Sequence, residues 1–402
     1  MRKNSLAKLK QILSLDSELN KIQDLDIFLE KLLFEARKIA RADAGSIYIR
    51  NNKDLVITYA QNDTMQKNLP PGQKLPFSSF KVPINTHTIS GYAAATGKAV
   101  NIPDVYEIPK DAPYGFSPAY DKQSGYRTTS SLAVPIKKNT GEVLGVLQIL
   151  NALDSRGKII SFSPDEVLMI SHFATSASTA LERVQQTRVI LLRMIRMAEM
   201  RDPKETGAHV NRVAGYAVEI YERWAAKQNI EPRIIERTKD NLRIAAMLHD
   251  VGKVAISDTI LKAPRRFTPE EYEIMKTHTT QGAALFIDKQ SDSDDMAQEI
   301  ALTHHENWDG TGYPGFTVGG KTGIPRKGRQ IPLFGLIVAI ADVYDALRSA
   351  RVYKEAWSEE QVLDEMRSMS GKKFDPELLE IFFEVLPNIK SISGKYPDDH
   401  GA

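Results

Sequence analysis

Residues 241–253 read NLRIAAMLHDVGK, an apolar stretch that ends in a histidine followed directly by an aspartate. The spacing of its apolar residues predicts a helix that packs into a core. A charged carboxylate at the end of such a helix is costly unless it is paired or bound to a metal ion. His249 and Asp250 are therefore candidate metal ligands, and they place the candidate site in a helical domain.

The histidines of the chain gather in the same half. Five of the eight fall between positions 209 and 305, namely His209, His249, His278, His304 and His305. Glu205 precedes His209 by four residues, so a helix would present both side chains on one face. Asp342 lies within a second apolar helical stretch, LIVAIADVYDAL (336–347), where an unpaired carboxylate would again be costly.

Imidazole and carboxylate ligands without thiolates favour first-row divalent metal ions, and the chain has no cysteine. The five histidines with Glu205, Asp250 and Asp342 exceed what one ion needs, and Asp250 could bridge two ions. Any one of these histidines alone would be better explained as a core histidine satisfied by a local hydrogen bond. The remaining histidines are assigned no metal role: His87, His172 and His400.

The motifs RDPKETGAH, HDVGK, KTH, HHENWDGTGYPGF and IADVYDALRSARVYK together resemble the HD-GYP subgroup of HD phosphohydrolases, which are bacterial cyclic-di-GMP phosphodiesterases. The resemblance covers roughly residues 198–390. It implies two or three divalent ions, iron or manganese, and the presence of Glu205 favours three. The residues that match its metal ligands are Glu205, His209, His249, Asp250, His278, His304, His305 and Asp342.

The resemblance also implies a reaction, the hydrolysis of cyclic-di-GMP to pGpG, with further hydrolysis to GMP left open. His249, Asp250 and Lys253 are the expected catalytic residues, with a hydroxide bridging two ions as the nucleophile. The expected substrate contacts are Lys253, Gly312, Tyr313, Pro314, Arg351 and Lys354. Two alternatives stay open: a phosphodiesterase for another cyclic dinucleotide such as cyclic GMP–AMP, and a nucleotide-binding signalling adaptor.

The first half alternates strand and turn signals. Strands are expected at SIYIR (46–50), DLVITYA (54–60), SSLAVPIKK (130–138) and EVLGVLQILN (142–151). With TISGYAAATGKAVNIPDV, these segments look like a GAF domain, an α+β small-molecule sensor with an antiparallel sheet and flanking helices. The resemblance implies either a small-molecule ligand or a GAF domain that only dimerises.

A long helix is expected to join the two halves, because residues 165–202 contain neither proline nor glycine. Its apolar residues alternate by three and four through Ile170, Phe173, Ala177, Ala180, Val184, Thr187, Leu191, Met194 and Ala198. Packing against its own domain is the favoured interpretation for the first two turns, and a parallel homodimer helix for the remainder.

The expected organisation is multidomain. It comprises an N-terminal helix or tail (1–21), the GAF domain (22–163), the linker helix (164–200), an all-α HD-GYP domain (201–392) and a polar tail (393–402). The 51 acidic and 53 basic residues nearly cancel, which gives no case for nucleic acid or a membrane surface. The most apolar later run (331–347) falls short of the ~20 residues that span a bilayer. We therefore expect a cytoplasmic protein.

Overall fold

The computed structural model describes residues 15, 17–70, 73–75, 80–199, 207–318, 321–348 and 357–397. Glu205, Arg351 and Lys354, three of the expected site residues, lie outside these ranges. The chain divides into two compact units, Met1–Arg188 and Val189–Ala402. Among the described residues, no helix is long and apolar enough to cross a bilayer.

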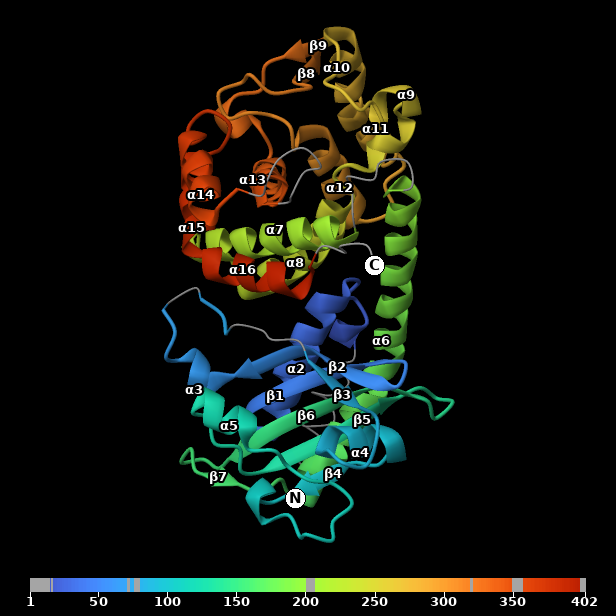
Figure 1. Cartoon of the computed structure of the whole chain (residues 1–402), viewed down its shortest axis with the longest axis vertical. Helices are drawn as coiled ribbons and strands as arrows, with labels where there is room; N and C mark the ends of the chain where they lie inside the picture. The colour runs from blue at the N-terminus through green and yellow to red at the C-terminus, as the bar shows by residue number, and fades with distance from the viewer. Residues whose placement is uncertain are drawn as a thin grey trace. The chain divides into compact units, whose positions relative to one another are not determined.

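The first unit is built on one antiparallel sheet (Figure 1). Its six-strand path runs β3-β2-β1-β6-β5-β4, and the short β7 pairs with β6. The strands are β1 (Ala42–Asn51), β2 (Asp54–Asn62), β3 (Lys81–Pro83), β4 (Val100–Ile102), β5 (Ser131–Lys137), β6 (Val143–Leu153) and β7 (Ile159–Ile160). The expected strands and the α+β class of this half are therefore confirmed.

Helices cover both faces of this sheet. On one face, α2 (Leu25–Ala40) and the first part of α6 (Pro164–Glu199) form a core with β1, β5 and β6. On the other face, α4 (Ile89–Thr96) packs with β2, β4 and the loop after β4. The remaining short helices of this unit are α3 (Asp63–Gln66), η1 (Val105–Glu107) and α5 (Ala119–Ser124).

The first part of α6 packs against its own unit for longer than expected. Its apolar residues are buried in the core of the first unit for about five turns, not only two, through Ile170, Phe173, Ala177, Ala180 and Val184. A helical apolar stripe has the same spacing whether it covers a sheet of its own chain or another helix. Beyond Arg188, α6 instead exposes large apolar side chains, which are Val189, Ile190, Met194 and Met197.

The second unit is helical, with one exception to the expected all-α class. Its helices are α7 (Gly207–Lys227), α8 (Pro232–Met247), η2 (Val251–Ala255), α9 (Asp258–Leu261), α10 (Pro269–Lys276), α11 (His278–Ala284), α12 (Asp292–Thr303), η3 (Gly328–Gln330), α13 (Leu333–Arg348), α14 (Glu359–Ser368), α15 (Pro376–Glu384) and α16 (Leu386–Lys395). The exception is a hairpin of two short strands, β8 (Phe316–Val318) and β9 (Lys321–Ile324).

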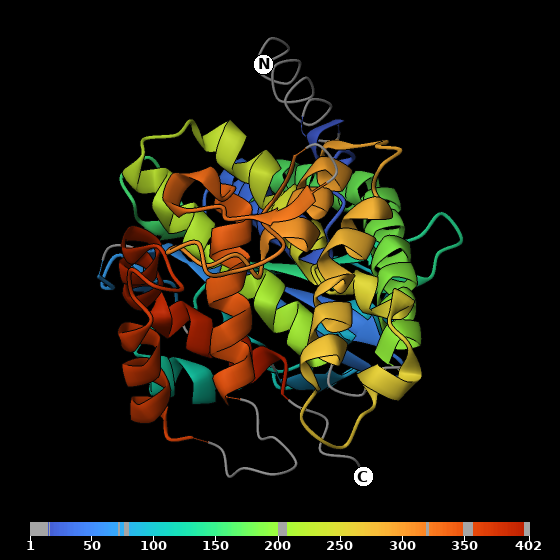
Figure 2. The ribbon, with the colours of Figure 1, turned by 90° about the horizontal axis from the view of Figure 1, so that it is seen from above.

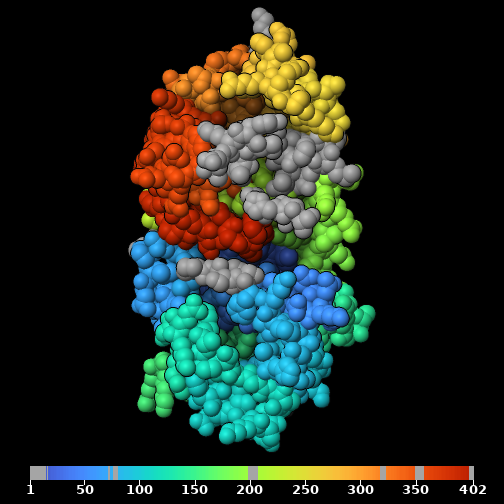
Figure 3. Space-filling model, viewed as in Figure 1, coloured from blue at the N-terminus to red at the C-terminus, as the bar shows by residue number. Residues whose placement is uncertain are grey.

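Four helices form the centre of this unit. Each contacts the next in a closed ring: α7 with α8, α8 with α12, α12 with α13, and α13 with α7. The apolar helix α13 is seen nearly end-on in Figure 1, whereas α7 runs across the view, so the two helices cross. Figure 2 likewise shows helices of this unit running in several directions. On the face shown in Figure 3, the red C-terminal helices and the yellow α9–α11 segment occupy separate regions.

A glycine allows two of these elements to touch. A Cβ atom at Gly252, in η2, would overlap the carbonyl oxygen of His278 and the backbone of Gly282. The missing side chain therefore lets η2 lie directly against α11. Asp250 immediately precedes η2 and His278 begins α11, so this contact brings the two residues together.

We predict that Gly252→Ala lowers the stability of the second unit by about 1–3 kcal/mol, because the added methyl group must push backbone apart. The matched control is Gly394→Ala in α16, where a Cβ would meet no atom within 4 Å. Calorimetry of metal-free protein should show the melting temperature of one transition falling by about 2–10 °C for Gly252→Ala only. Equal melting temperatures for wild type and Gly252→Ala would contradict this close contact.

Candidate metal centre

The end of α8 presents the first two candidate ligands. The helix ends at Met247, and His249 is 1% exposed. The Nδ1 atom of His249 lies 2.8 Å from the carbonyl oxygen of Ala246, in the last turn of the helix. Asp250 follows as the residue before η2, with its side chain 10% exposed.

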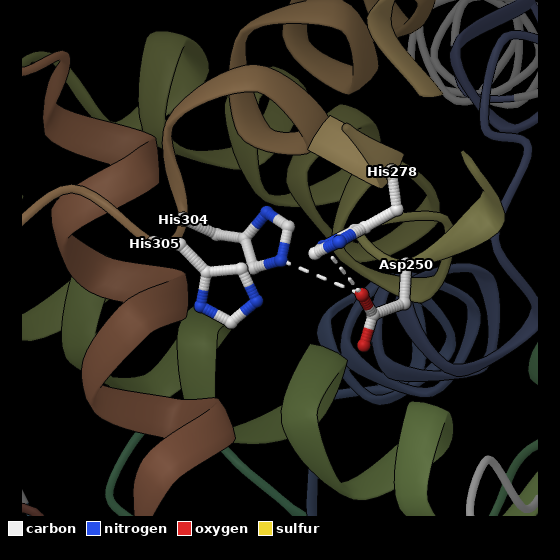
Figure 4. A group of neighbouring side chains, drawn as sticks. All are labelled: Asp250, His278, His304 and His305. Atoms are coloured by element: carbon white, nitrogen blue, oxygen red, sulfur yellow. Dashed lines mark ion pairs between the residues drawn. The ribbon is translucent and has the colours of Figure 1, made fainter. Parts of the chain in front are cut away.

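One group of ligand atoms contains Asp250, His278, His304 and His305, all within 4.8 Å of one another. Figure 4 shows these side chains converging from three segments of the chain. Asp250 Oδ1 lies 3.1 Å from His278 Nε2 and 3.6 Å from His304 Nε2. His278 is the first residue of α11, and the adjacent histidines follow α12.

A second group contains His209, His249 and Asp342, again within 4.8 Å of one another. His209 comes from α7 and Asp342 from α13, and His209 Nε2 lies 3.6 Å from Asp342 Oδ1. Every expected ligand in the described part of the chain therefore belongs to one of the two groups. Glu205, the remaining expected ligand, lies outside the described residues.

Asp250 joins the two groups. While Oδ1 faces His278 and His304, Oδ2 lies 3.2 Å from His249 Nε2 and 2.9 Å from the Lys253 ammonium. Burial alone would raise the pKa of Asp250, but Lys253 and His249 hold it well below its usual value. The carboxylate is therefore charged and presents one oxygen to each group, which is the geometry of a bridging ligand.

The imidazoles are oriented by backbone carbonyls. In each of three histidines Nδ1 faces a carbonyl oxygen, which fixes Nδ1 as the donor and leaves the Nε2 lone pair facing inward. The distances are 2.8 Å for His249 to Ala246, 2.7 Å for His278 to Met275 and 3.0 Å for His304 to Ile300. The helix ends that carry these rings therefore orient their Nε2 atoms for metal binding.

Asp345 has the corresponding role for His209, and the sequence analysis did not assign it one. Its Oδ2 lies 2.8 Å from His209 Nδ1, and Arg212 donates to both of its oxygens at 2.6 and 2.8 Å. Burial alone would raise the pKa of Asp345, but His209 and Arg212 lower it. The available signal was a second carboxylate three residues after Asp342 in the same apolar helix, hence on nearly the same face.

Three buried atoms at the centre test whether a metal ion fits. Asp250 Oδ1, His278 Nε2 and His304 Nε2 are inaccessible and have no hydrogen-bond partner among the described residues. Buried polar atoms without partners are rare because they cost free energy. A divalent cation would satisfy all three at once, and their donor types suit first-row metals. The residues therefore fit a metal ion.

His304 and His305 are neighbours that can serve the same group because they do not continue a helix. The helix α12 ends at Thr303, and His304 occupies the position that caps it. The two rings lie with their centroids 4.1 Å apart and tilted by 42°. Burial lowers the pKa of both imidazoles, so they are neutral and available as ligands.

The loop after these histidines folds back against them. A Cβ at Gly312 would overlap the backbone of Glu306 and Asn307, so this glycine has a packing role. The Tyr313 ring lies 4.9 Å from the His305 ring, and burial raises the pKa of its hydroxyl. A substrate contact by Tyr313, Pro314 or Gly312 remains a prediction.

Glu306 holds this loop in place and was also missed by the sequence analysis. It is 1% exposed, and its Oε1 accepts a hydrogen bond of 2.8 Å from the backbone N–H of Gly315. Burial raises its pKa, whereas the Gly315 N–H and Arg326 oppose that shift. The signal in the sequence was its position directly after two candidate ligands, because a carboxylate that is buried there needs a partner.

Each unit matches a known domain family. Residues 24–181 match the GAF domain family and residues 193–378 match the HD domain family. A cyclic di-GMP phosphodiesterase of Vibrio cholerae is 38% identical over 247 residues, 59% of this chain and 48% of that protein. One from Thermotoga maritima is 40% identical over 203 residues, 50% of each chain.

A third relative is named for a different substrate. A 3′3′-cGAMP-specific phosphodiesterase 2 of Vibrio cholerae is 38% identical over 195 residues, 48% of this chain and 34% of that protein. The chain thus spans half or less of the length of these curated relatives.

We predict that His278→Ala lowers the metal content of the purified full-length protein, because it removes an imidazole from the Asp250 group. The control is His172→Ala, which replaces an exposed histidine on α6. Elemental analysis after dialysis should show at least one ion fewer per chain for His278→Ala and no change for His172→Ala. Equal metal content in all three proteins, with unchanged circular dichroism, would show that this group does not bind metal.

Proposed function

The chain joins a GAF domain to an HD domain, and we propose that it is a metal-dependent phosphodiesterase that hydrolyses cyclic-di-GMP to pGpG. The observation that carries this proposal is the Asp250 carboxylate, which faces a different group of histidine ligands with each oxygen. Such a pair of sites suits in-line displacement at phosphorus, where two ions act on the attacking and leaving oxygens. Relatives named cyclic di-GMP phosphodiesterases support the choice of substrate.

The two groups of ligands support at least two ions, and the imidazole and carboxylate donors favour iron or manganese. A third ion held with the help of Glu205 is part of the proposal, although Glu205 lies outside the described residues. When bound, such ions lower the pKa of water and neutralise charge on a phosphate. The cytoplasmic location expected from the sequence also remains a prediction.

The chain's own residues would position the substrate. Asp250 keeps its charge through its contact with Lys253, whose ammonium lies 2.9 Å from Oδ2. In the complex, Lys253 would also contact a phosphate oxygen from beside the metal centre. Tyr313, largely buried beside His305, would form an aromatic wall against which a base can stack. Arg351 and Lys354, outside the described residues, would contact the phosphates as well.

A cyclic GMP–AMP dinucleotide is the second candidate substrate. It is favoured by the 3′3′-cGAMP-specific relative and by DALRSARVY (345–353), which departs from the D-A-L-T-S-D-R-P-Y pattern beside the expected phosphate contacts. The catalytic centre would serve either substrate, because the metal ligands act on the phosphodiester and not on the base. A pure signalling adaptor is disfavoured, since nucleotide binding alone does not require two groups of metal ligands.

The GAF domain would act as the sensor. A cavity of about 460 Å³ lies at the loop that follows β4. It is lined by His87 and by residues between 105 and 118, including Tyr106, Tyr114 and Phe116. The aromatic side chains of this cavity would contact a small-molecule ligand of the domain.

The exposed face of α6 supports a homodimer. Ile190, Met194 and Met197 are 57%, 53% and 69% exposed and recur at the i, i+4, i+7 spacing of a helix seam. A parallel second copy would cover this stripe, and the shared helix would connect the sensor to the catalytic unit.

We predict that wild-type protein loaded with iron or manganese hydrolyses cyclic-di-GMP, and that Asp250→Ala abolishes turnover because both ligand groups lose an oxygen. Chromatography of the products identifies pGpG. Lys262→Ala, which removes an exposed cation directly after α9, is the control and should keep wild-type turnover. Full activity of Asp250→Ala after removal of metal would contradict the mechanism. Faster turnover of cyclic GMP–AMP would favour the second candidate substrate.

For the dimer, we predict that Ile190→Glu converts the protein to monomers, because it places a charge in the exposed apolar stripe of α6. The control is Ile274→Glu on α10, a residue that is 46% exposed, and this variant should stay dimeric. Analytical ultracentrifugation measures the mass of each. A wild-type protein that is monomeric at micromolar concentration would contradict the assignment of this helix face.

A further inference from the structure

Tyr313 connects the metal centre to a second tyrosine. The centroid of its ring lies 4.9 Å from that of His305 and 6.4 Å from that of His278. It also lies 6.4 Å from the ring centroid of Tyr272, and the planes of the two tyrosine rings are nearly perpendicular, at 79°. Tyr272 belongs to α10 and is 46% exposed. An exposed aromatic ring therefore lies one ring beyond a residue that contacts the metal ligands.

A cation lies close to both tyrosine rings. The Nζ atom of Lys276 is 4.9 Å from the ring centroid of Tyr272 and 5.7 Å from that of Tyr313. Both distances fall within the range of about 6 Å over which an ammonium is attracted to an aromatic face. The ammonium also pairs with Glu273 at 2.6 Å, and the Glu273 side chain is 71% exposed. Because an exposed ion pair contributes little free energy, the ammonium can exchange this partner for a ligand.

The helix that carries Tyr272 and Lys276 is held next to the metal centre. Lys276 is the last residue of α10, and His278 begins α11 after a single residue. At the other end of α10, Thr268 and Glu271 form a capping box that fixes its first turn. Tyr272 and Lys276 are four residues apart, so they share one face of the helix. The two side chains therefore have a defined position relative to a metal ligand.

An exposed aromatic ring with a cation beside it has the chemistry of a base-binding site. Nucleobases stack on aromatic side chains because every base has a π face. One edge of guanine carries two acceptors, O6 and N7, whereas the same edge of adenine carries N7 and an amino donor. A lysine can only donate, and its flexible stem lets the ammonium move from the ring face of Tyr272 to the edge of a stacked base. Such a lysine favours guanine over adenine.

We propose that Tyr272 and Lys276 bind one guanine of the substrate: the base stacks on the Tyr272 ring, and the Lys276 ammonium donates to O6 and N7. This site deepens the phosphodiesterase function proposed above and rests on it, since it names the base that is recognised beside the metal centre. The metal ligands act on the phosphodiester, whereas these two residues of α10 contact the base. They therefore determine affinity and base specificity.

The first test measures the kinetics of the full-length, metal-loaded protein on cyclic-di-GMP. Tyr272→Ala should raise KM by about five- to a hundredfold, which corresponds to the loss of one stacked base. The effect should fall mainly on KM, because stacking acts on the ground state and the transition state alike. Tyr272→Phe keeps the ring and should bind substrate nearly as well as wild type. The matched control is Ile274→Ala, which replaces an apolar residue of α10 that is equally exposed, at 46%, and should keep the wild-type KM.

The second test does not depend on turnover. Isothermal titration calorimetry of the metal-loaded protein measures Kd for GMP, for AMP and for ribose 5-phosphate, which has no base. Lys276→Met should weaken GMP binding by about tenfold and AMP binding by less. Tyr272→Ala should weaken the binding of both nucleotides but not that of ribose 5-phosphate. The control is Lys262→Met, which removes a cation from a similar exposed ion pair with Asp258 and should leave all three Kd values unchanged.

The following results would overturn the assignment. Unchanged KM and GMP affinity in Tyr272→Ala would show that no base stacks there, as would a wild type that binds GMP no better than ribose 5-phosphate. Equal losses for all three ligands in Lys276→Met would place the ammonium on a phosphate. Loss of metal from either variant, measured by elemental analysis, would show that the residue supports the ligands. If wild type binds GMP through Tyr272 but does not hydrolyse cyclic-di-GMP, the substrate proposed above fails while the guanine site stands.

Discussion

The structure of the second unit depends on one buried carboxylate that must remain charged. Burial alone would raise the pKa of Asp250, but Lys253 and the surrounding imidazoles hold it well below its usual value. Its position after α8 requires that η2 lie against α11, which the absence of a side chain at Gly252 permits. The same carboxylate then faces both ligand groups. Packing of the helices and chemistry of the site are thus constrained by the same residue.

Helix ends are the second feature that assembles this site. His249 follows α8, His278 begins α11 and His304 caps α12. At these positions carbonyl oxygens face the imidazole Nδ1 atoms and direct the opposite nitrogens inward. Two further ligands, His209 and Asp342, come from helices that cross, and Asp345 with Arg212 orients the first of them. These contacts orient the ligand side chains independently of any ion.

Much of this site could be predicted from the sequence because its ligands are rare residue types in unfavourable places, such as Asp342 in an apolar helix. The supporting residues could not be assigned, because Asp345 and Glu306 become informative only when their partners across the fold are known. The four longer strands of the first unit followed from apolar alternation and turn signals, and its α+β class followed from the resemblance to GAF domains. The length of α6 that packs on its own unit could not be predicted. Apolar spacing through Val184 does not identify which surface covers those residues.

Whether Asp250 joins two metal sites can be measured directly. Anomalous diffraction from crystals of the full-length protein, collected on both sides of the iron or manganese absorption edge, locates the ions. We expect at least two peaks, about 3.5–4 Å apart, with one Asp250 oxygen facing each. One peak would lie by His278 and His304, and the other by His209 and Asp342. A single peak, or two peaks that Asp250 does not contact, would contradict it.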